Sequence, residues 1–223
     1  MSYFNKFLFN FTQKSFLILL VVLIFRSNDS YSQSWYSLGT GSNNTVRSLI
    51  TFNNELYAAG DFNSMSGISA NRIAKWNGSI WQPAGLGTNN RIDAMIVFNG
   101  ELIVAGSFTQ VGGVNASRIA KWNGTNWLLF GNNSNFNDEI LALTVYNNQL
   151  YAAGRFTNIG GINVNRIAFW NGNSWQSVGL GLSNTARSLA VFGNQLAVGG
   201  DFTTAGGINA NRVAVWNGSA WSA

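Results

Sequence analysis

Short apolar runs separated by polar turn residues alternate along the chain after its first 33 residues. The first such unit opens with the run VRSLITF (46–52), and after the turn Asn53-Asn54 the chain continues as ELYAAGDF (55–62). A loop rich in glycine and serine leads into a third run, NRIAKW, and a fourth run, SIWQPAG, follows the pair Asn77-Gly78. Apolar runs of this length between turn residues predict four β-strands and no helix.

The third and fourth runs of every unit are joined by an asparagine followed by a glycine. The pair occurs as Asn77-Gly78, Asn123-Gly124, Asn171-Gly172 and Asn217-Gly218. Both residue types tolerate positive φ angles, which a two-residue type I′ turn needs at its two central positions. We therefore expect a β-hairpin closed by a type I′ turn at each pair.

The pattern recurs with a nearly constant period. One tryptophan ladder, with steps of 46, 46, 48 and 46 residues, consists of Trp35, Trp81, Trp127, Trp175 and Trp221. Steps of 46, 48 and 46 separate the members of a second ladder, Trp76, Trp122, Trp170 and Trp216, and of a glycine ladder, Gly60, Gly106, Gly154 and Gly200. The repeat units are placed at about 35–80, 81–126, 127–174 and 175–220, with the start of a further unit at 221.

A single four-stranded sheet of this length cannot bury both of its faces, so neighbouring sheets must pack on one another. Small alanine and glycine residues in the second strand suit crowded sheets, and the tryptophans can fill the wider space between them. The sequence therefore predicts an all-β fold, a β-propeller in which each of four repeats forms a four-stranded antiparallel blade. In this interpretation the tryptophans are structural and do not form an exposed aromatic platform.

The predicted ring is incomplete. The repeat region begins with a fourth-strand motif, SWYSLG (34–39), and ends inside another, SAWSA (219–223). In a closed ring Trp35 and Trp221 would compete for one position. We expect the sequence to be an N-terminal fragment of a longer chain, and a complete four-bladed propeller is the alternative.

The repeats resemble those of known propeller families. The order of a glycine-ended strand such as LYAAGDF, a loop bearing GG and a paired W…W hairpin is similar to Kelch-type repeats. The fuller pattern AGxFTxxGGxxxNRIAxWNGxxW resembles repeats of secreted and cell-surface propeller proteins, including fungal cortical landmark proteins and bacterial surface proteins with type IX secretion sorting domains. The resemblance covers residues 35–221 and implies interaction or surface roles.

The first 32 residues have a different composition and predict a secretory signal peptide. Lys6 and Lys14 precede an unbroken apolar run of ten residues (16–25), which as a helix is about half as long as a bilayer core is thick. Ser30 and Ser32 suit cleavage before Gln33. We expect a secreted or cell-surface protein with no membrane span after cleavage; the alternative is an uncleaved N-terminal anchor.

Charge and cysteine content narrow the possible partners. Three of the 13 basic residues and one of the 8 acidic residues fall within residues 1–32, which leaves 10 and 7 in the rest of the chain. The basic residues are scattered, whereas phosphate binding needs a cluster, so we expect no nucleic-acid partner. The chain has no cysteine, so packing without disulfides must hold the exported fold together.

The sequence offers little catalytic chemistry. It contains no histidine and no cysteine, which removes most nucleophile triads, most zinc sites and most general bases active near neutral pH. We expect no catalytic residue, no metal site and no cofactor. Among the remaining carboxylates, Asp61 and Asp201 follow a strand-ending glycine, where Ser107 and Arg155 stand in the other two units, and they are interpreted as turn caps.

Two groups of residues are candidate binding sites. Four arginines recur four residues before a tryptophan and could form an anion-binding ring, although such arginines also satisfy loop carbonyls. They are Arg72, Arg118, Arg166 and Arg212. The second candidate is a ligand loop in the connection GNNSNFNDEI, where the repeat gains two residues, with Phe136, Asp138 and Glu139 as its candidate residues; a tolerated surface insertion is the alternative.

We therefore expect a non-catalytic exported β-propeller that serves as a binding, adhesion or scaffold module for a protein or glycan at the cell surface. One alternative is a hydrolase or lyase acting on polysaccharide, for which Asp93, Asp138 and Glu139 lie in equivalent connections. Another is a set of spacer blades in a larger surface protein.

Overall fold

The computed structural model describes residues 36–131 and 134–223. Every secondary-structure element in that part of the chain is a β-strand. The chain divides into two units, Met1–Tyr36 and Ser37–Ala223, and the fold is that of the second. The predicted signal peptide (1–32) and Trp35 lie outside the described residues. Within the described part, no helix is long and apolar enough to cross a membrane.

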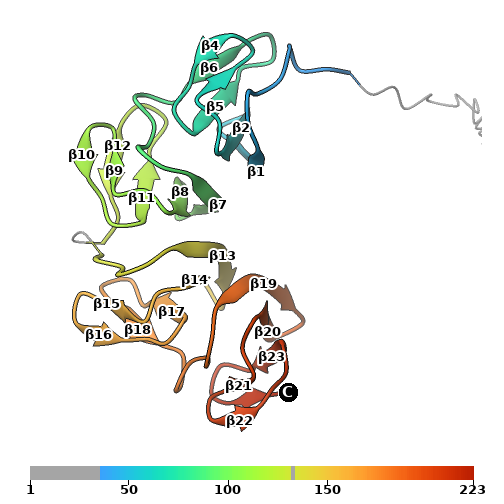
Figure 1. The fold of residues 1–223 in the computed structure, drawn as a ribbon, viewed down its shortest axis with the longest axis vertical. Helices are drawn as coiled ribbons and strands as arrows, with labels where there is room; N and C mark the ends of the chain where they lie inside the picture. The colour runs from blue at the N-terminus through green and yellow to red at the C-terminus, as the bar shows by residue number, and fades with distance from the viewer. Residues whose placement is uncertain (1–35, 132–133) are drawn as a thin grey trace, which may run out of the picture. The chain divides into compact units, whose positions relative to one another are not determined.

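Four antiparallel sheets, here called blades 1 to 4, follow one another along the chain (Figure 1). Blade 1 consists, in spatial order, of β1 (Val46–Phe52), β2 (Glu55–Gly60), β5 (Ile73–Trp76) and β6 (Trp81–Pro83). Blade 2 consists of β7 (Ile92–Phe98), β8 (Glu101–Gly106), β11 (Ile119–Trp122) and β12 (Trp127–Leu129). Blade 3 consists of β13 (Ile140–Tyr146), β14 (Gln149–Gly154), β17 (Ile167–Trp170) and β18 (Trp175–Ser177). Blade 4 consists of β19 (Ala186–Phe192), β20 (Gln195–Gly200), β23 (Val213–Trp216) and β24 (Trp221–Ser222).

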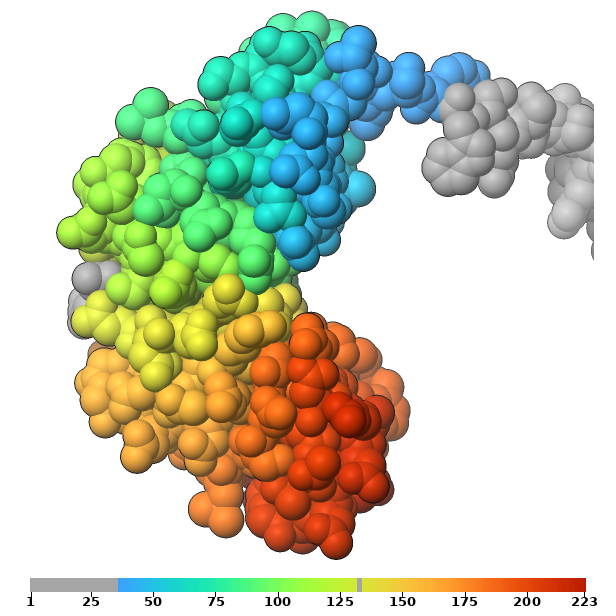
Figure 2. All heavy atoms as spheres, viewed as in Figure 1, coloured from blue at the N-terminus to red at the C-terminus, as the bar shows by residue number. Residues whose placement is uncertain are grey.

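The blades are joined through their first strands. Strand β1 contacts β7, β7 contacts β13, and β13 contacts β19. Four similar four-stranded sheets in this arrangement form the blades of a β-propeller, so the predicted fold is confirmed. The four sheets are not closed into a ring (Figure 2).

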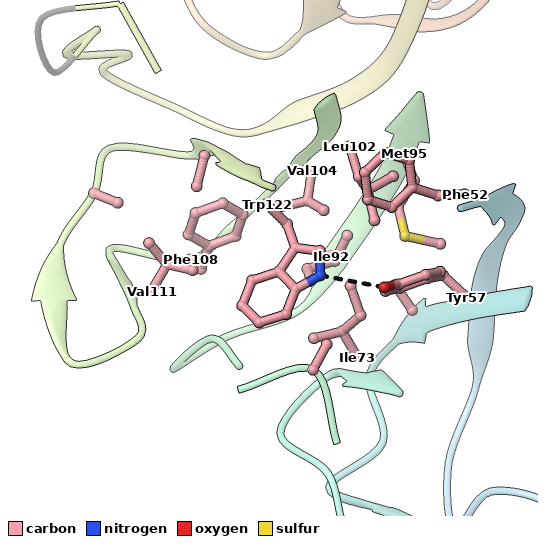
Figure 3. Close-up of a cluster of buried hydrophobic side chains, with 14 residues drawn as sticks. Phe52, Tyr57, Ile73, Ile92, Met95, Leu102, Val104, Phe108, Val111 and Trp122 are labelled. Atoms are coloured by element: carbon pink, nitrogen blue, oxygen red, sulfur yellow. Dashed lines mark hydrogen bonds between the residues drawn. The ribbon is translucent and has the colours of Figure 1, made fainter. Parts of the chain in front are cut away.

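The blade interfaces are apolar and rich in aromatic rings, as Figure 3 shows for blades 1 and 2. Tyr57 and Phe52 of blade 1 pack with Met95 and Trp122 of blade 2, and the Trp122 indole nitrogen donates a hydrogen bond of 3.2 Å to the Tyr57 hydroxyl. The other tryptophan ladder serves the same purpose, because the indole nitrogen of Trp127 donates to the Ala84 carbonyl at 2.9 Å. The structural interpretation of the tryptophans is therefore confirmed for these interfaces.

The loop between the second and third strands of each blade is more ordered than the sequence predicted, since it contains a short hairpin. The hairpin strands are β3 (Ser64–Met65) with β4 (Ile68–Ser69), β9 (Gln110–Val111) with β10 (Val114–Asn115), β15 (Asn158–Ile159) with β16 (Ile162–Asn163), and β21 (Thr204–Ala205) with β22 (Ile208–Asn209). One apolar residue of the first hairpin strand is buried in every blade: Met65, Val111, Ile159 and Ala205.

The predicted type I′ turns at the Asn-Gly pairs are wrong. Trp76 pairs directly with Trp81, which leaves a loop of four residues instead of two. Asn77 keeps an ordinary φ, and its side-chain oxygen accepts hydrogen bonds from the amides of Ser79 and Ile80, both at 3.0 Å. The asparagine thus closes the loop through its side chain, which a two-residue turn would not allow.

Candidate functional site

The first strand of each blade is irregular at its second residue, where the pairing register shifts and a β-bulge forms. A bulge turns its residue away from the regular alternation of the strand. The four bulge residues are Arg47, Asp93, Leu141 and Arg187, and all of them line one cavity of about 350 Å³, together with Thr45 and Val46. This four-blade cavity thus receives one bulge residue from each blade.

A series of ion pairs crosses the blades beside the four-blade cavity. A terminal nitrogen of Arg47 lies 3.7 Å from the carboxylate of Asp93, and the Nε of Arg91 lies 3.0 Å from the same carboxylate. The Arg91 Nη2 then reaches Glu139 Oε2 of blade 3 at 2.8 Å, and Arg155 Nε approaches that oxygen at 3.6 Å. Charges of opposite sign therefore alternate from blade 1 to blade 3.

Both arginines of the four-blade cavity are also held by a carboxylate of their own blade. Arg47 Nε donates to Asp61 Oδ2 at 2.7 Å. Arg187 donates to both carboxylate oxygens of Asp201, including from Nε to Oδ1 at 2.9 Å and from Nη2 to Oδ2 at 2.6 Å. The side chain of Arg187 nevertheless remains 53% exposed. Paired arginines of this kind are oriented, and their remaining N–H groups can still bind a ligand.

The interpretation of Asp61 and Asp201 as turn caps is corrected by these contacts, because both carboxylates bind arginine side chains. The two carboxyls next to the arginines of the cavity also differ in acidity. Burial raises the pKa of Asp93, although Arg91 and Arg47 act in the opposite direction. The hydrogen bonds from Arg187 lower the pKa of Asp201, which is exposed to solvent. Ionisation of Asp93 is therefore opposed by its surroundings, whereas ionisation of Asp201 is favoured.

We expect Asp93→Asn and Asp201→Asn to change the pH dependence of stability in opposite directions. A carboxyl with a raised pKa binds more protons in the native state, so its contribution to the free energy of unfolding falls as the pH rises above about 4. Asp93→Asn should therefore gain stability relative to the wild type with rising pH. The lowered pKa of Asp201 contributes stability that is present above about pH 4 and lost below it, and Asp201→Asn should lack this contribution. Thermal unfolding measured across this pH range checks both variants; parallel profiles would contradict the expectation.

Two further ion pairs each lie within a single blade. Lys75 Nζ lies 3.0 Å from Glu55 Oε2 in blade 1, and Lys121 Nζ lies 2.9 Å from Glu101 Oε2 in blade 2. In the described ranges, no three Asp, Glu, His or Cys residues lie together in a way that could hold a metal ion.

The four predicted ring arginines lie one in each blade, directly before the third strand, and none of them lines the four-blade cavity. Each has a positive φ, between 68° and 74°, and donates from Nη1 to a main-chain carbonyl of the residue eleven positions earlier. These arginines therefore satisfy loop carbonyls, one of the two roles considered for them. An anion-binding ring of Arg72, Arg118, Arg166 and Arg212 stays a prediction.

The three candidate residues of the predicted ligand loop lie in different environments. Phe136 is buried, with its ring centroid 4.8 Å from that of Phe156 and 5.1 Å from that of Trp175. Glu139 belongs to the ion pairs beside the four-blade cavity. Asp138 accepts a hydrogen bond of 2.7 Å from the Glu139 amide through Oδ1. A ligand-binding role of this loop stays a prediction, which Asp138 and Glu139 would carry.

The two additional residues of this unit have a structural consequence. In the other blades the indole nitrogen of the first-ladder tryptophan donates to a main-chain carbonyl, as Trp127 does to Ala84. In blade 3 the Trp175 nitrogen donates at 2.8 Å to the hydroxyl of Ser134, which lies 3.1 Å from the Phe130 carbonyl. Ser134 therefore inserts a hydroxyl between a tryptophan and the carbonyl that its counterparts bind directly.

Sequence reasoning missed the four-blade cavity, although its signal is present in the repeat. When the four copies are aligned by their tryptophans, one position holds Arg47, Asp93, Leu141 and Arg187. The third run of each unit is more uniform, as in NRIAKW and its copies. The first strands of neighbouring blades are expected to meet. A change of charge from copy to copy at one position of these strands could therefore have indicated a site.

Comparisons with known proteins agree with the fold. A family model described as a domain of unknown function (DUF5122) beta-propeller matches residues 99–124. No curated protein matches the chain. The crystal structure of the computationally designed Ika4 protein is similar over 82% of this chain and 98% of its own, with a TM-score of 0.50 and 14% identity. For the computationally designed Ika8 protein these values are 80%, 60%, 0.38 and 13%. The chain is thus similar to β-propellers in fold.

Proposed function

We propose that the protein is an exported, non-catalytic binding module at the cell surface, and that its ligand binds in the four-blade cavity. The observation that carries the proposal is the convergence of one bulge residue from each blade on this cavity. The blades repeat the same strands and turns, yet at this position they present Arg47, Asp93, Leu141 and Arg187. A cavity lined by different side chains from equivalent positions is typical of a binding site on a rigid scaffold.

The lining of the cavity favours an acidic glycan as the ligand. Arg47 and Arg187 supply planar guanidinium groups, which bind carboxylates through paired hydrogen bonds. Thr45 adds a hydroxyl and Leu141 an apolar surface, which suit the hydroxyl groups and the C–H face of a sugar ring. The resemblance of the repeats to Kelch-type and to secreted surface propellers, together with the predicted signal peptide, supports a location at the cell surface.

The ion pairs argue against glycoside hydrolysis. That reaction commonly needs one carboxylic acid and one carboxylate on either side of the scissile bond. Asp93 and Glu139 are both bound to Arg91, which therefore bridges the two carboxylates. The raised pKa of Asp93 is the one observation that favours an enzyme, so polysaccharide hydrolysis or cleavage by a lyase remains the second candidate. Turnover of a polysaccharide that Asp93→Asn abolishes would establish it.

We expect Arg187→Gln to weaken binding of an acidic oligosaccharide, such as an oligomer of galacturonic acid, by about 10-fold to 100-fold. The estimate is the contribution of a hydrogen bond to a charged group. Isothermal titration calorimetry with the purified chain measures the affinity. Arg212→Gln is the matched control, because it removes the same charge from the same blade at a residue outside the four-blade cavity.

The control also separates two predictions. Loss of binding in Arg187→Gln and retention in Arg212→Gln supports the four-blade cavity. The reverse result would support the ring of loop arginines instead. Binding of a neutral oligosaccharide with the same affinity would contradict the assignment of an acidic ligand, and binding only of peptides would change the ligand class.

A further inference from the structure

Blade 4 leaves one apolar sheet face uncovered. At the last position of the first strand, Phe52, Phe98 and Tyr146 are buried against the following blade, but Phe192 is 52% exposed. At the first position of the third strand the three preceding blades have a buried isoleucine, whereas Val213 is 58% exposed. The free face of blade 4 therefore exposes residues whose equivalents in blades 1 to 3 are buried against the following blade.

Blade 1 leaves the complementary face uncovered. Leu49 is 61% exposed, whereas the equivalent Met95 of blade 2 is buried against blade 1. Val46 is exposed, and its equivalents at the three other blades are buried. This face is hollowed by an apolar groove of about 480 Å³ whose lining includes Leu38, Leu49 and Trp81. It is the kind of face that receives Phe52, Phe98 and Tyr146 at the three interior interfaces.

We propose that the free face of blade 4 packs on the free face of blade 1 of a second copy of this chain. The contact continues the pattern of the three interior interfaces, which supply its template. Because two different faces meet, the association is head to tail, and it produces a closed ring or a filament according to the angle between copies. This inference goes beyond the proposed function and does not depend on a ligand.

Charge does not oppose the contact. The equivalent of the Arg47–Asp93 pair would bring Arg187 close to Arg47 of the second copy. Arg187 is already paired with Asp201, and Arg47 with Asp61, so each side brings a neutral pair of residues to the interface. Apolar burial is then the dominant contribution to association.

The test compares the oligomeric state of the purified chain and its variants by analytical ultracentrifugation. The wild-type chain is expected to form dimers or larger species. Phe192→Asp, which damages only the face of blade 4, and Leu49→Asp, which damages only the face of blade 1, are each expected to be monomeric. Each variant keeps one intact face, so an equimolar mixture of the two should form a dimer.

The mixture distinguishes this arrangement from a symmetric one. A contact between two blade 4 faces would be insensitive to Leu49→Asp and would not reappear in the mixture. Leu180→Asp, at a residue that is 73% exposed and belongs to neither free face, is the control and should associate like the wild type. A monomeric wild type at high protein concentration, or a mixture that stays monomeric although circular dichroism shows both variants folded, would overturn the proposal.

Discussion

Trp122→Ala is expected to lower the free energy of unfolding by about 3–5 kcal/mol, the usual cost of removing a buried tryptophan side chain. The indole of Trp122 is buried between blades 1 and 2, where it packs in the cluster that contains Tyr57 and Met95. Its nitrogen also donates to the Tyr57 hydroxyl, so the alanine variant both leaves a cavity and removes a buried hydrogen bond. Urea unfolding followed by circular dichroism measures the loss.

Trp76 provides a control at the equivalent position of blade 1. It is only partly buried and packs against the cluster of blade 1 that contains Trp81. Trp76→Ala should therefore cost about 1–2 kcal/mol, roughly the contribution of partial burial of an apolar side chain. If a second copy covers blade 1, the cost of Trp76→Ala should increase with protein concentration. Equal costs for the two variants in dilute solution would contradict the assignment of Trp122 to a blade interface.

Gly200→Ala is expected to destabilise the protein by about 1–3 kcal/mol, the range of overpacking in a core. A Cβ atom at Gly200 would lie 2.2 Å from the Thr185 carbonyl oxygen. That oxygen is held in place, because it accepts a hydrogen bond of 2.8 Å from the Asp201 amide. The glycine ladder thus marks where the second strand crosses closest to the bulge of the first strand, and thermal unfolding of the variant measures the strain.

The adjacent residue Gly199 is the matched control. A Cβ atom there would meet only the hydroxyl of Ser188 at 2.6 Å, which can rotate away. Alanine occupies the same position in the three other blades, as Ala59, Ala105 and Ala153. Gly199→Ala should therefore be neutral or stabilising by about 0.4–1 kcal/mol, because it restricts the unfolded chain. A similar loss of stability in both variants would contradict this prediction. It would show that the strand tolerates no added methyl group at either glycine, whatever the distance to the Thr185 carbonyl.

The repeat made much of the fold accessible from the sequence. Every strand of the four sheets follows from short apolar runs between turn residues, and the tryptophan and glycine ladders place the runs in register with one another. These signals are local, or they repeat with a fixed period, so they can be recognised without knowledge of the fold. The turn at Asn77-Gly78 was misassigned because the asparagine side chain, not the backbone preference of the pair, closes the loop.

The candidate site was not accessible in the same way. Single residues about 46 positions apart gave no reason to suspect contact, and the loop arginines, which recur in every unit, attracted attention instead. Arg72 and its equivalents recur because every blade has the same loop carbonyl to satisfy. Arg47 and Arg187 differ from their equivalents in blades 2 and 3, and their role became visible only where the blades meet.

The sequence by itself determined that this protein is a series of four-stranded blades, because strand length, turn position and interface tryptophans are encoded within each 46-residue unit. Only the tertiary structure decided which side chains share the four-blade cavity and which sheet faces stay uncovered. Both depend on how successive blades pack, and the angle between blades results from the combined volumes of side chains from two units. No single unit contains that information.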